Sequence, residues 1–490
     1  MQNSSNGWKV VVGGVVVLGI VMALIIWGGD SAGAGIALFF LALVGLAFLF
    51  WVRIDLLPAF AFLCLVLVPD RVLVIPALHV VPPETLFMVV WVIRKVFAAK
   101  PADVDSTGRG LLRFAVIAMM AWLVILTFLS INTSNSIAWT LSFGLFVALP
   151  ILVRDVRAES ATLARVWLWT GSILALYALL QSLIQANPIY DAIYGALKLG
   201  PIQHWVVYRA DVSLGHPLTA GLFFATTLAL AVGQWIQSRN RIYAVVALVA
   251  GLGVVVTVSR GAYVAAGIGV SVVLILAMVS GRRFGRGRLG LIVILFGVFA
   301  YFAIRSDTFV ERSTSAEGAG SIAGRDGLLD ISTTTASAFH WRGSGPGTSG
   351  LAAIPYNYQL LPIESAYFQL LISIGIPGLI LFAALIAAVF AMLLRRHDIA
   401  VAGGLVSLLV AMGGYASIDG IRIIIPLIGF LILIGLGGAL SHRVESGAES
   451  GADKAFADSV EPDDAALSTH RDASPNRPGP PRVTGRRPAH

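Results

Sequence analysis

The sequence has a single cysteine, Cys64, and few charged residues for a chain of 490 residues. One cysteine excludes a disulfide framework and a thiolate metal site, and no histidine–carboxylate spacing suggests a metal site of another kind. Charged residues make up 12% of the positions and apolar residues 57%, so a soluble fold would have more apolar surface than it could enclose. The shortage of charge therefore excludes the ordinary soluble classes.

In place of charge, the sequence has a series of apolar stretches of roughly 20 residues, the length that crosses a bilayer as a helix. They predict an all-α polytopic integral membrane protein with about 12–14 transmembrane helices. No small-residue cleavage site follows the first stretch, so we expect a retained helix rather than a signal peptide. Prolines break the third and fourth stretches, so a re-entrant or kinked segment is an alternative to two full spans there. The expected spans are 8–28, 32–52, 55–69, 80–97, 111–130, 136–153, 163–185, 217–237, 242–259, 261–280, 289–304, 364–394, 399–418 and 421–440.

Clusters of lysine and arginine predict the sidedness of these helices. Successive clusters are separated by two spans, so all of them fall on one face, which the positive-inside rule makes cytoplasmic. Both termini then lie in the cytoplasm, and the long loops 186–216 and 305–363 lie outside together with the turn at Arg260. The clusters are Arg94/Lys95/Lys100/Arg109/Arg113, Arg154/Arg157/Arg165, Arg239/Arg241, Arg282/Arg283/Arg286/Arg288 and Arg395/Arg396.

Residues 1–440 are expected to form the membrane domain, and residues 441–490 a disordered cytoplasmic tail. The tail is rich in Ala, Gly, Asp, Pro and Arg and has no apolar periodicity. Its basic end, 482–487, either contacts anionic lipid headgroups or only keeps the tail soluble. The net charge of +8 comes from the lysine and arginine clusters expected on the inner face and from the basic end of this tail, so it does not indicate nucleic-acid binding.

Arg260 is the most informative single residue. It stands in Ser259-Arg260-Gly261, between the apolar runs 242–258 and 262–280, on the face expected to be extracytoplasmic. An arginine between two membrane-length segments is costly, and it usually lies in a water-filled cavity where it handles a charged group. Because a guanidinium binds phosphate oxygens in a bidentate manner, we expect Arg260 to bind an anion, with a structural ion pair as the alternative.

Further polar residues gather in the expected outer loops. Several arginines around one outer cavity would suit a pyrophosphate, but nearby aspartates make structural ion pairs equally consistent for Arg209 and Arg325. His216, before a proline at the start of a span, is a candidate ligand, proton shuttle or helix cap. Glu364 begins the apolar stretch 364–382, where partial desolvation favours a general base and the helix dipole equally favours a structural carboxylate. The same loops hold Tyr208, Asp211, Asp326, Trp341, Arg342, Ser365 and Tyr367.

Two other short motifs indicate little. The glycine-rich segment 343–350 lacks the lysine of a phosphate-binding loop and faces outward, so we expect an irregular loop there. Asp103-Val104-Asp105 resembles the paired aspartates of nucleotide-sugar transferases, but a solvated linker is the simpler explanation for so short a pattern. Neither motif therefore adds a nucleotide site.

Taken in order, the outer motifs resemble the O-antigen ligase and Wzy-type polymerase superfamily of bacterial polysaccharide assembly. The resemblance covers roughly residues 200 to 390, and it depends on the order, sidedness and spacing of the motifs around a large outer loop. Its elements are Arg209 with Gly215-His216-Pro217, Thr257-Val258-Ser259-Arg260-Gly261-Ala262, Gly324-Arg325 with Gly343-Ser344-Gly345-Pro346-Gly347-Thr348, and Glu364-Ser365-Ala366-Tyr367 leading into Ile374-Gly375-Ile376-Pro377-Gly378-Leu379.

The resemblance implies a GT-C-like membrane glycosyltransferase that uses no nucleotide-sugar donor, no metal and no other cofactor. Family members transfer a glycan from a polyprenyl diphosphate carrier, such as undecaprenyl diphosphate, to an acceptor sugar hydroxyl outside the cytoplasmic membrane. Carried onto this chain, Arg260 and Arg325 would hold the donor diphosphate and stabilise its leaving charge, and Glu364 would face the acceptor hydroxyl. The implied substrate-binding residues are Arg209, His216, Arg342 and Tyr367.

One position departs from the family pattern, because ligases of this family typically carry a histidine where this chain has Glu364. The difference favours an inner-membrane polymerase of an exopolysaccharide or O-antigen over a ligase that attaches finished glycan to a lipid A-core or protein. A transporter of lipid-linked glycan and a structural membrane scaffold are the alternatives of other classes. The expected partners are the lipid-linked glycan, an acceptor glycan and membrane lipids, with a chain-length regulator left open and no nucleic acid.

Overall fold

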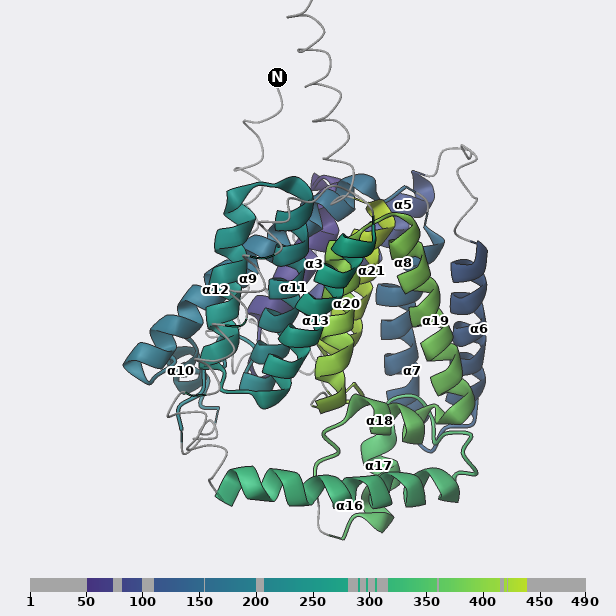
Figure 1. Cartoon of the computed structure of the whole chain (residues 1–490). Coiled ribbons are helices and arrows are strands. Elements are labelled where there is room, and N and C mark those ends of the chain that lie inside the picture. The colour runs from purple at the N-terminus through teal and green to yellow at the C-terminus, as the bar shows by residue number, and fades with distance from the viewer. Residues whose placement is uncertain are drawn as a thin grey trace, which may run out of the picture. The chain divides into compact units, whose positions relative to one another are not determined.

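The computed structural model describes residues 51–73, 82–98, 110–153, 155–199, 207–280, 316–358, 361–414, 418–420 and 422–438, and the isolated positions 290, 297 and 305 (Figure 1). Of residues 316–326 it describes the backbone alone. The expected span 8–28, nearly all of the spans 32–52 and 289–304, the aspartate pair at 103 and 105, and the tail 441–490 lie outside the described residues.

Every regular element in this described part of the chain is helical, which confirms the all-α class expected from the sequence. Six segments are long and apolar enough to cross a membrane: Gly110–Phe128, Thr133–Leu152, Arg157–Ile184, Pro217–Ser238, Arg260–Val279 and Gly375–Arg395. Shorter apolar helices accompany them at Ile54–Leu67, Arg241–Val256, Ile399–Gly414 and Ile424–Gly437. The protein is therefore a polytopic α-helical membrane protein.

The described helices follow one another through the chain in a fixed order. The α-helices are α3 (Leu57–Leu67), α5 (Pro83–Phe97), α6 (Gly110–Phe128), α7 (Thr133–Phe143), α8 (Leu149–Leu152), α9 (Arg157–Ile184), α10 (Pro188–Ala196), α11 (Pro217–Ser238), α12 (Arg241–Val256), α13 (Arg260–Val279), α16 (Ala316–Ala338), α17 (Ser349–Ala353), α18 (Ala366–Ser373), α19 (Gly375–Arg395), α20 (Ile399–Gly414) and α21 (Ile424–Gly437). The other helical turns are the 3-10 helices η1 (Ile54–Leu56), η2 (Asp70–Val72) and η4 (Ile354–Tyr356), and the π-helix η3 (Gly144–Ala148).

α11 lies at the centre of the described helices, between α9, α12, α13 and α20 (Figure 1). Of its apolar window, 94% is buried inside the protein, against 39% for α6 and α19. Small residues allow the neighbours to approach closely: a Cβ on Gly233 would lie 2.4 Å from the Ala400 Cα, and one on Gly221 2.7 Å from the Ala262 Cβ. Close approach of backbones is how membrane helices gain packing energy in the absence of a hydrophobic driving force between them.

Several basic connections lie at the same end of the helices. Arg396, after α19, donates to the Gly435 carbonyl near the end of α21 at 3.2 Å. The end of α11 reaches the same connection, because the Gln237 amide donates to the His397 carbonyl at 2.7 Å. Arg260 begins α13 and therefore lies at the opposite end of the α12–α13 pair from Arg241. This arrangement is consistent with the common face expected for the basic clusters.

The expected single span 364–394 is wrong, because the structure contains two helices there. α18 ends at Ser373, and α19 begins at Gly375, which has a φ of +68°. A Cβ on Gly375 would lie 2.3 Å from the Arg342 carbonyl carbon, so only glycine fits against the segment that follows α16. The membrane-length helix therefore begins 11 residues after Glu364 rather than at it.

The expected loop 305–363 contains a helix that apolar patterning did not indicate. α16 lies across the ends of other helices, beside α17 and α18 (Figure 1). After it, an irregular loop was expected over residues 343–350; residues 343–348 are irregular, with φ values of +103°, +119° and +72° at Gly343, Gly345 and Gly347, but α17 already begins at Ser349. The loop 305–363 is thus partly helical, and its glycine-rich part packs against the α18–α19 junction.

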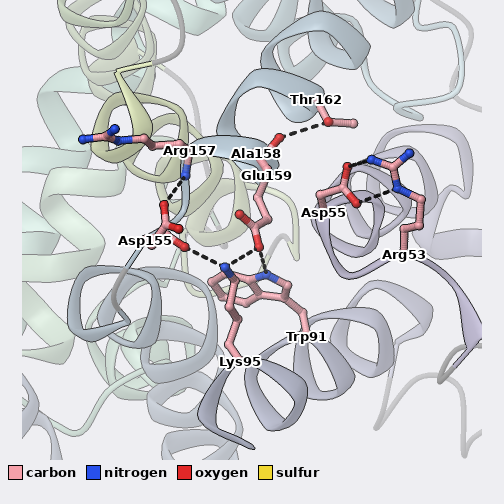
Figure 2. A network of polar contacts seen from close by, with 9 residues as sticks. All are labelled: Arg53, Asp55, Trp91, Lys95, Asp155, Arg157, Ala158, Glu159 and Thr162. Carbon is pink, nitrogen blue, oxygen red and sulfur yellow. Dashed lines mark hydrogen bonds and ion pairs between the residues drawn. The ribbon is translucent and has the colours of Figure 1, made fainter. Parts of the chain in front are cut away.

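A buried ion pair joins α5 to the first turn of α9 (Figure 2). The Lys95 ammonium lies 2.7 Å from a Glu159 carboxylate oxygen, and it also donates to the Asp155 carbonyl at 2.6 Å. The same Glu159 oxygen accepts a hydrogen bond from the Trp91 indole at 3.4 Å. Because Glu159 is 1% exposed, these donors replace the water that its charge lost on burial.

Replacing Lys95 with methionine is expected to lower the free energy of unfolding by roughly 3 kcal/mol, because Glu159 would keep a buried charge without its ammonium partner. Thermal unfolding of the detergent-solubilised protein measures this loss. The double variant K95M/E159Q removes both charges and should recover much of it. Equal melting temperatures for K95M and the wild-type protein would contradict the stabilising role.

Asp398 lies between α19 and α20 and caps α20. One carboxylate oxygen accepts from the Val401 amide at 3.2 Å, and the residue is 1% exposed. Burial raises the pKa of its carboxyl group from 3.8 to about 7. The folded state therefore holds this proton more tightly than the unfolded state, and the group costs stability as the pH rises through that window.

The variant D398N keeps the capping oxygen and removes the buried charge. We expect its melting temperature to exceed that of the wild type at a pH of about 8, and this difference to shrink at a pH of about 5. Thermal melts across that range measure the difference. A stabilising effect of D398N that did not change with pH would show that the Asp398 carboxyl does not titrate as its burial implies.

Candidate active site

Two segments far apart in the sequence meet at the turn between α12 and α13. The Arg209 Nε donates to the Thr257 carbonyl at 3.0 Å, and the Ala210 amide donates to the Val256 carbonyl at 3.1 Å. Arg209 is 2% exposed, so its guanidinium is held inside the protein. The structure therefore brings Arg209 against the turn that carries Arg260, as a common site requires.

The turn itself places Arg260 at the first position of α13. Val258 has a positive φ of +49°, which reverses the chain within a few residues, and Ser259 caps α13 by accepting from the Ala262 amide at 3.3 Å. A cation at the first turn of a helix opposes the helix dipole, so helix stability does not explain an arginine there. A half-buried guanidinium beside a helix N-terminus is suited to an anion.

The end of α20 lies between this turn and α18. A Cβ on Gly414 would lie 4.0 Å from the Gly261 Cα, and one on Gly413 3.3 Å from the Tyr367 ring. The Tyr367 hydroxyl donates to the Leu409 carbonyl of α20 at 2.7 Å. Tyr367, expected to bind substrate, thus has a structural contact that joins α18 to α20. The Arg260 turn and the start of α18 flank the same helix end.

Glu364 lies two residues before α18 and is half-buried. The preceding residue, Ile363, is held by Gln369, whose side-chain amide donates to the Ile363 carbonyl at 2.8 Å. The Gln369 side-chain oxygen, Oε1, in turn accepts from the Asp419 backbone amide at 3.2 Å. The segment that carries Glu364 is therefore connected both to α18 and to the chain between α20 and α21.

The remaining predicted residues have different surroundings. His216 caps α11, since its Nδ1 accepts from the Leu218 amide at 3.2 Å, which is one of the three roles expected for it. Arg342 is exposed and follows α16, next to Trp341, whose carbonyl accepts from the Ile376 amide at 2.9 Å. Arg325 lies on α16, and its side chain is outside the described residues. The structure therefore places Arg209 against the Arg260 turn, and it places that turn and the start of α18 at the same end of α20. A role for Arg325 stays a prediction.

Sequence reasoning missed Gln369 and Asp419. The Asp419 carboxylate accepts from the Ser349 amide at 3.1 Å. Burial raises the pKa of this carboxyl group to about 6, while the hydrogen bonds from Ser349 act in the opposite direction. The available signal was an aspartate in the short connection between the expected spans 399–418 and 421–440. Within the described residues, no group of three or more His, Cys, Asp and Glu side chains forms a metal-binding cluster.

Gln369 is expected to act as a positioning residue for Glu364. With Glu364 as the base expected from the sequence, the variant Q369A should lower kcat about tenfold or more while KM changes little, because misplacing a base slows the chemical step rather than binding. Q369E keeps the oxygen that accepts from Asp419 and loses the donor to Ile363, so it tests that one bond. If kcat and the melting temperature fell together, and added lipid restored both, Gln369 would contribute only to the stability of the fold.

A comparison with protein families matches the part of the chain that carries most of the candidate site residues. Residues 243–383 match the O-antigen ligase family model, and the matched segment includes Arg260, Arg325, Arg342, Glu364 and Tyr367. Arg209 and His216 lie before it. No curated protein matches the chain. Members of this family are membrane glycosyltransferase-like enzymes. The match of residues 243–383 supports the resemblance of this protein to the O-antigen ligase and Wzy-type polymerase superfamily.

Proposed function

We propose that the protein polymerises a bacterial surface polysaccharide, an exopolysaccharide or O-antigen, on the outer face of the cytoplasmic membrane. The donor is a glycan on polyprenyl diphosphate, and the acceptor is a sugar hydroxyl of a second glycan. The observation that carries the proposal is the meeting of Arg209, the Arg260 turn and the Glu364 segment around the end of α20. Both termini lie in the cytoplasm in this proposal.

The proposed reaction breaks the bond between the anomeric carbon and the diphosphate, and forms a bond from that carbon to the acceptor oxygen. Arg260 stabilises the negative charge on the departing diphosphate, with Arg209 and Arg325 completing the cationic site. Glu364 accepts the proton of the acceptor hydroxyl, which makes the oxygen a better nucleophile. The products are the lengthened glycan and polyprenyl diphosphate, and no metal or other cofactor takes part.

A polymerase is favoured over a ligase by the carboxylate at position 364. Ligases of the resembling family carry histidine there, and polymerases need no imidazole if a carboxylate removes the proton. The two activities leave different intermediates in cells. A strain without the polymerase should accumulate glycans of one repeat unit, and a strain without the ligase should accumulate long chains on the carrier.

The direct test incubates the purified protein with lipid-linked repeat unit and reads product length on a gel. A ladder of lengthened, carrier-linked glycan is expected, with and without a chelator. Transfer of one preformed chain to a lipid A-core acceptor, without lengthening, would assign the ligase activity instead. Release of neither longer glycan nor polyprenyl diphosphate would overturn the proposal.

A further inference from the structure

The connection between α9 and α11 contains a polar cluster that the proposed reaction does not use. Asn187 is its centre: its carbonyl oxygen accepts from the Tyr177 hydroxyl at 2.6 Å, and its amide donates to the Asp211 carboxylate at 2.8 Å and the Val212 carbonyl at 2.9 Å. Tyr190 of α10 donates to the Leu67 carbonyl at 3.0 Å. These bonds hold α9, α10 and the 207–216 segment together with the end of α3.

Within this frame, three polar groups are buried but have no hydrogen-bond partner in the described structure: the hydroxyls of Tyr194 and Tyr208 and the amide nitrogen of Gln181. Tyr194 is 3% exposed and Gln181 is fully buried. A buried polar group without a partner loses its hydration and gains nothing in return, and such groups are few in native proteins. Three of them around one frame indicate a place for a ligand that supplies the missing bonds.

The chemistry of the cluster selects the kind of ligand. Tyrosine hydroxyls both donate and accept, and an amide nitrogen donates twice, so the cluster suits a ligand with several hydroxyls. The Tyr194 ring adds an apolar face. A lipid tail would leave the polar groups without partners. A diphosphate is disfavoured because the Asp211 carboxylate, which interacts electrostatically with Tyr194 and Tyr208, would repel a second negative charge there. A sugar ring has the required combination of hydroxyls and apolar C–H faces.

The cluster also borders the candidate active site. Tyr208 immediately precedes Arg209, which is bonded to Thr257 three residues before Arg260. A Cβ on Gly215, next to His216, would lie 4.0 Å from the Tyr194 hydroxyl. A group in contact with Tyr194 and Tyr208 therefore lies beside the residues assigned to the diphosphate.

We infer that Tyr194, Tyr208 and Gln181 form a subsite for a sugar ring of the lipid-linked glycan, beside its diphosphate. The inference rests on the proposed function, and it adds a region of recognition that lies outside the matched family segment. Because the three groups are enclosed, α10 and the 207–216 segment must separate when the ring enters. The new bonds to the sugar hydroxyls then offset the lost hydration of the tyrosines.

The test uses the full-length protein and the variants Y194F and Y208F. Each removes a hydroxyl that has no partner in the described structure, so the melting temperature should stay equal or rise, while KM for the lipid-linked repeat unit should rise about tenfold. The matched control is Y190F on the same helix, which loses the bond to Leu67 and should lower the melting temperature without a comparable change in KM.

A binding arm separates this inference from the proposed function. Two probes are titrated into the protein: bare undecaprenyl diphosphate and undecaprenyl diphosphate that carries one sugar. The wild type should prefer the glycosylated probe, and Y194F and Y208F should lose that preference while keeping the affinity for the bare carrier. If the wild type polymerises glycan but both variants keep the preference and KM, the subsite is overturned and the proposed function stands. If the wild type shows no transfer and no preference, both fail.

Discussion

The variant R260A is expected to lose glycan transfer by about a hundredfold or more, because it removes a preorganised cation from the point where negative charge develops on the leaving diphosphate. Arg260 stands at the first position of α13, where its charge opposes the helix dipole. The charge therefore does not stabilise that helix. Because the proposed interaction strengthens as the diphosphate leaves, the loss of activity should appear in kcat. Initial rates of polyprenyl diphosphate release measure it.

The variant R260K distinguishes charge from geometry at the same position. It keeps the positive charge but loses the planar, bidentate donor pair, so we expect activity between that of R260A and the wild type. The matched control is R241A, at the other end of the α12–α13 pair, where an exposed arginine starts α12. R241A should retain transfer. Wild-type rates in folded R260A would eliminate Arg260 from the donor site.

The second large effect is expected at Glu364. E364Q should lower transfer by about a hundredfold or more, because the amide cannot accept the acceptor proton. Single repeat units and insertion into the membrane should be unchanged, since Glu364 lies in the segment before α18 and outside the membrane-length helix α19. Full-length polymer from cells that express only E364Q would contradict the base assignment.

The variant E364H tests the departure from the ligase pattern directly. A histidine at this position is able to accept the same proton, so partial activity is expected, with a pH dependence that follows an imidazole near its ordinary pKa of about 6.5. A variant as inactive as E364Q would indicate that the surroundings of position 364 fit a carboxylate alone. Pre-steady-state rates across the pH range distinguish the two results.

Much of the helical organisation was predictable because it depends on local composition. The turn at Arg260 was expected between spans ending at 259 and starting at 261, and the structure has α12 ending at Val256 and α13 starting at Arg260. The prolines around the third and fourth spans predicted an interruption, and α3 is only 11 residues long. Hydropathy also predicted both ends of α6 and α11 to within two residues, whereas α9 begins six residues before its expected start.

The failures have a common cause, which is contact between distant residues. Residues 364–394 were expected to form one span although Gly375, Pro377 and Gly378 interrupt their apolar character, and the backbone of Arg342 lies against Gly375 where the chain divides into α18 and α19. α16 has small and polar residues and little apolar periodicity, so its helix was not indicated. The hydrogen bond between the Gln369 side chain and the backbone amide of Asp419 links positions 50 residues apart, and no local pattern signals it.

The sequence by itself determined the class of the protein, the positions of most of the described helices and the order of the motifs, because apolar length and residue identity are local properties. Only the tertiary structure decided which of those motifs meet. Arg209 reaches the Arg260 turn through a hydrogen bond to Thr257, and that turn and α18 both lie against the end of α20. The physical reason is that glycine contacts and backbone hydrogen bonds form between segments that hydropathy treats as independent.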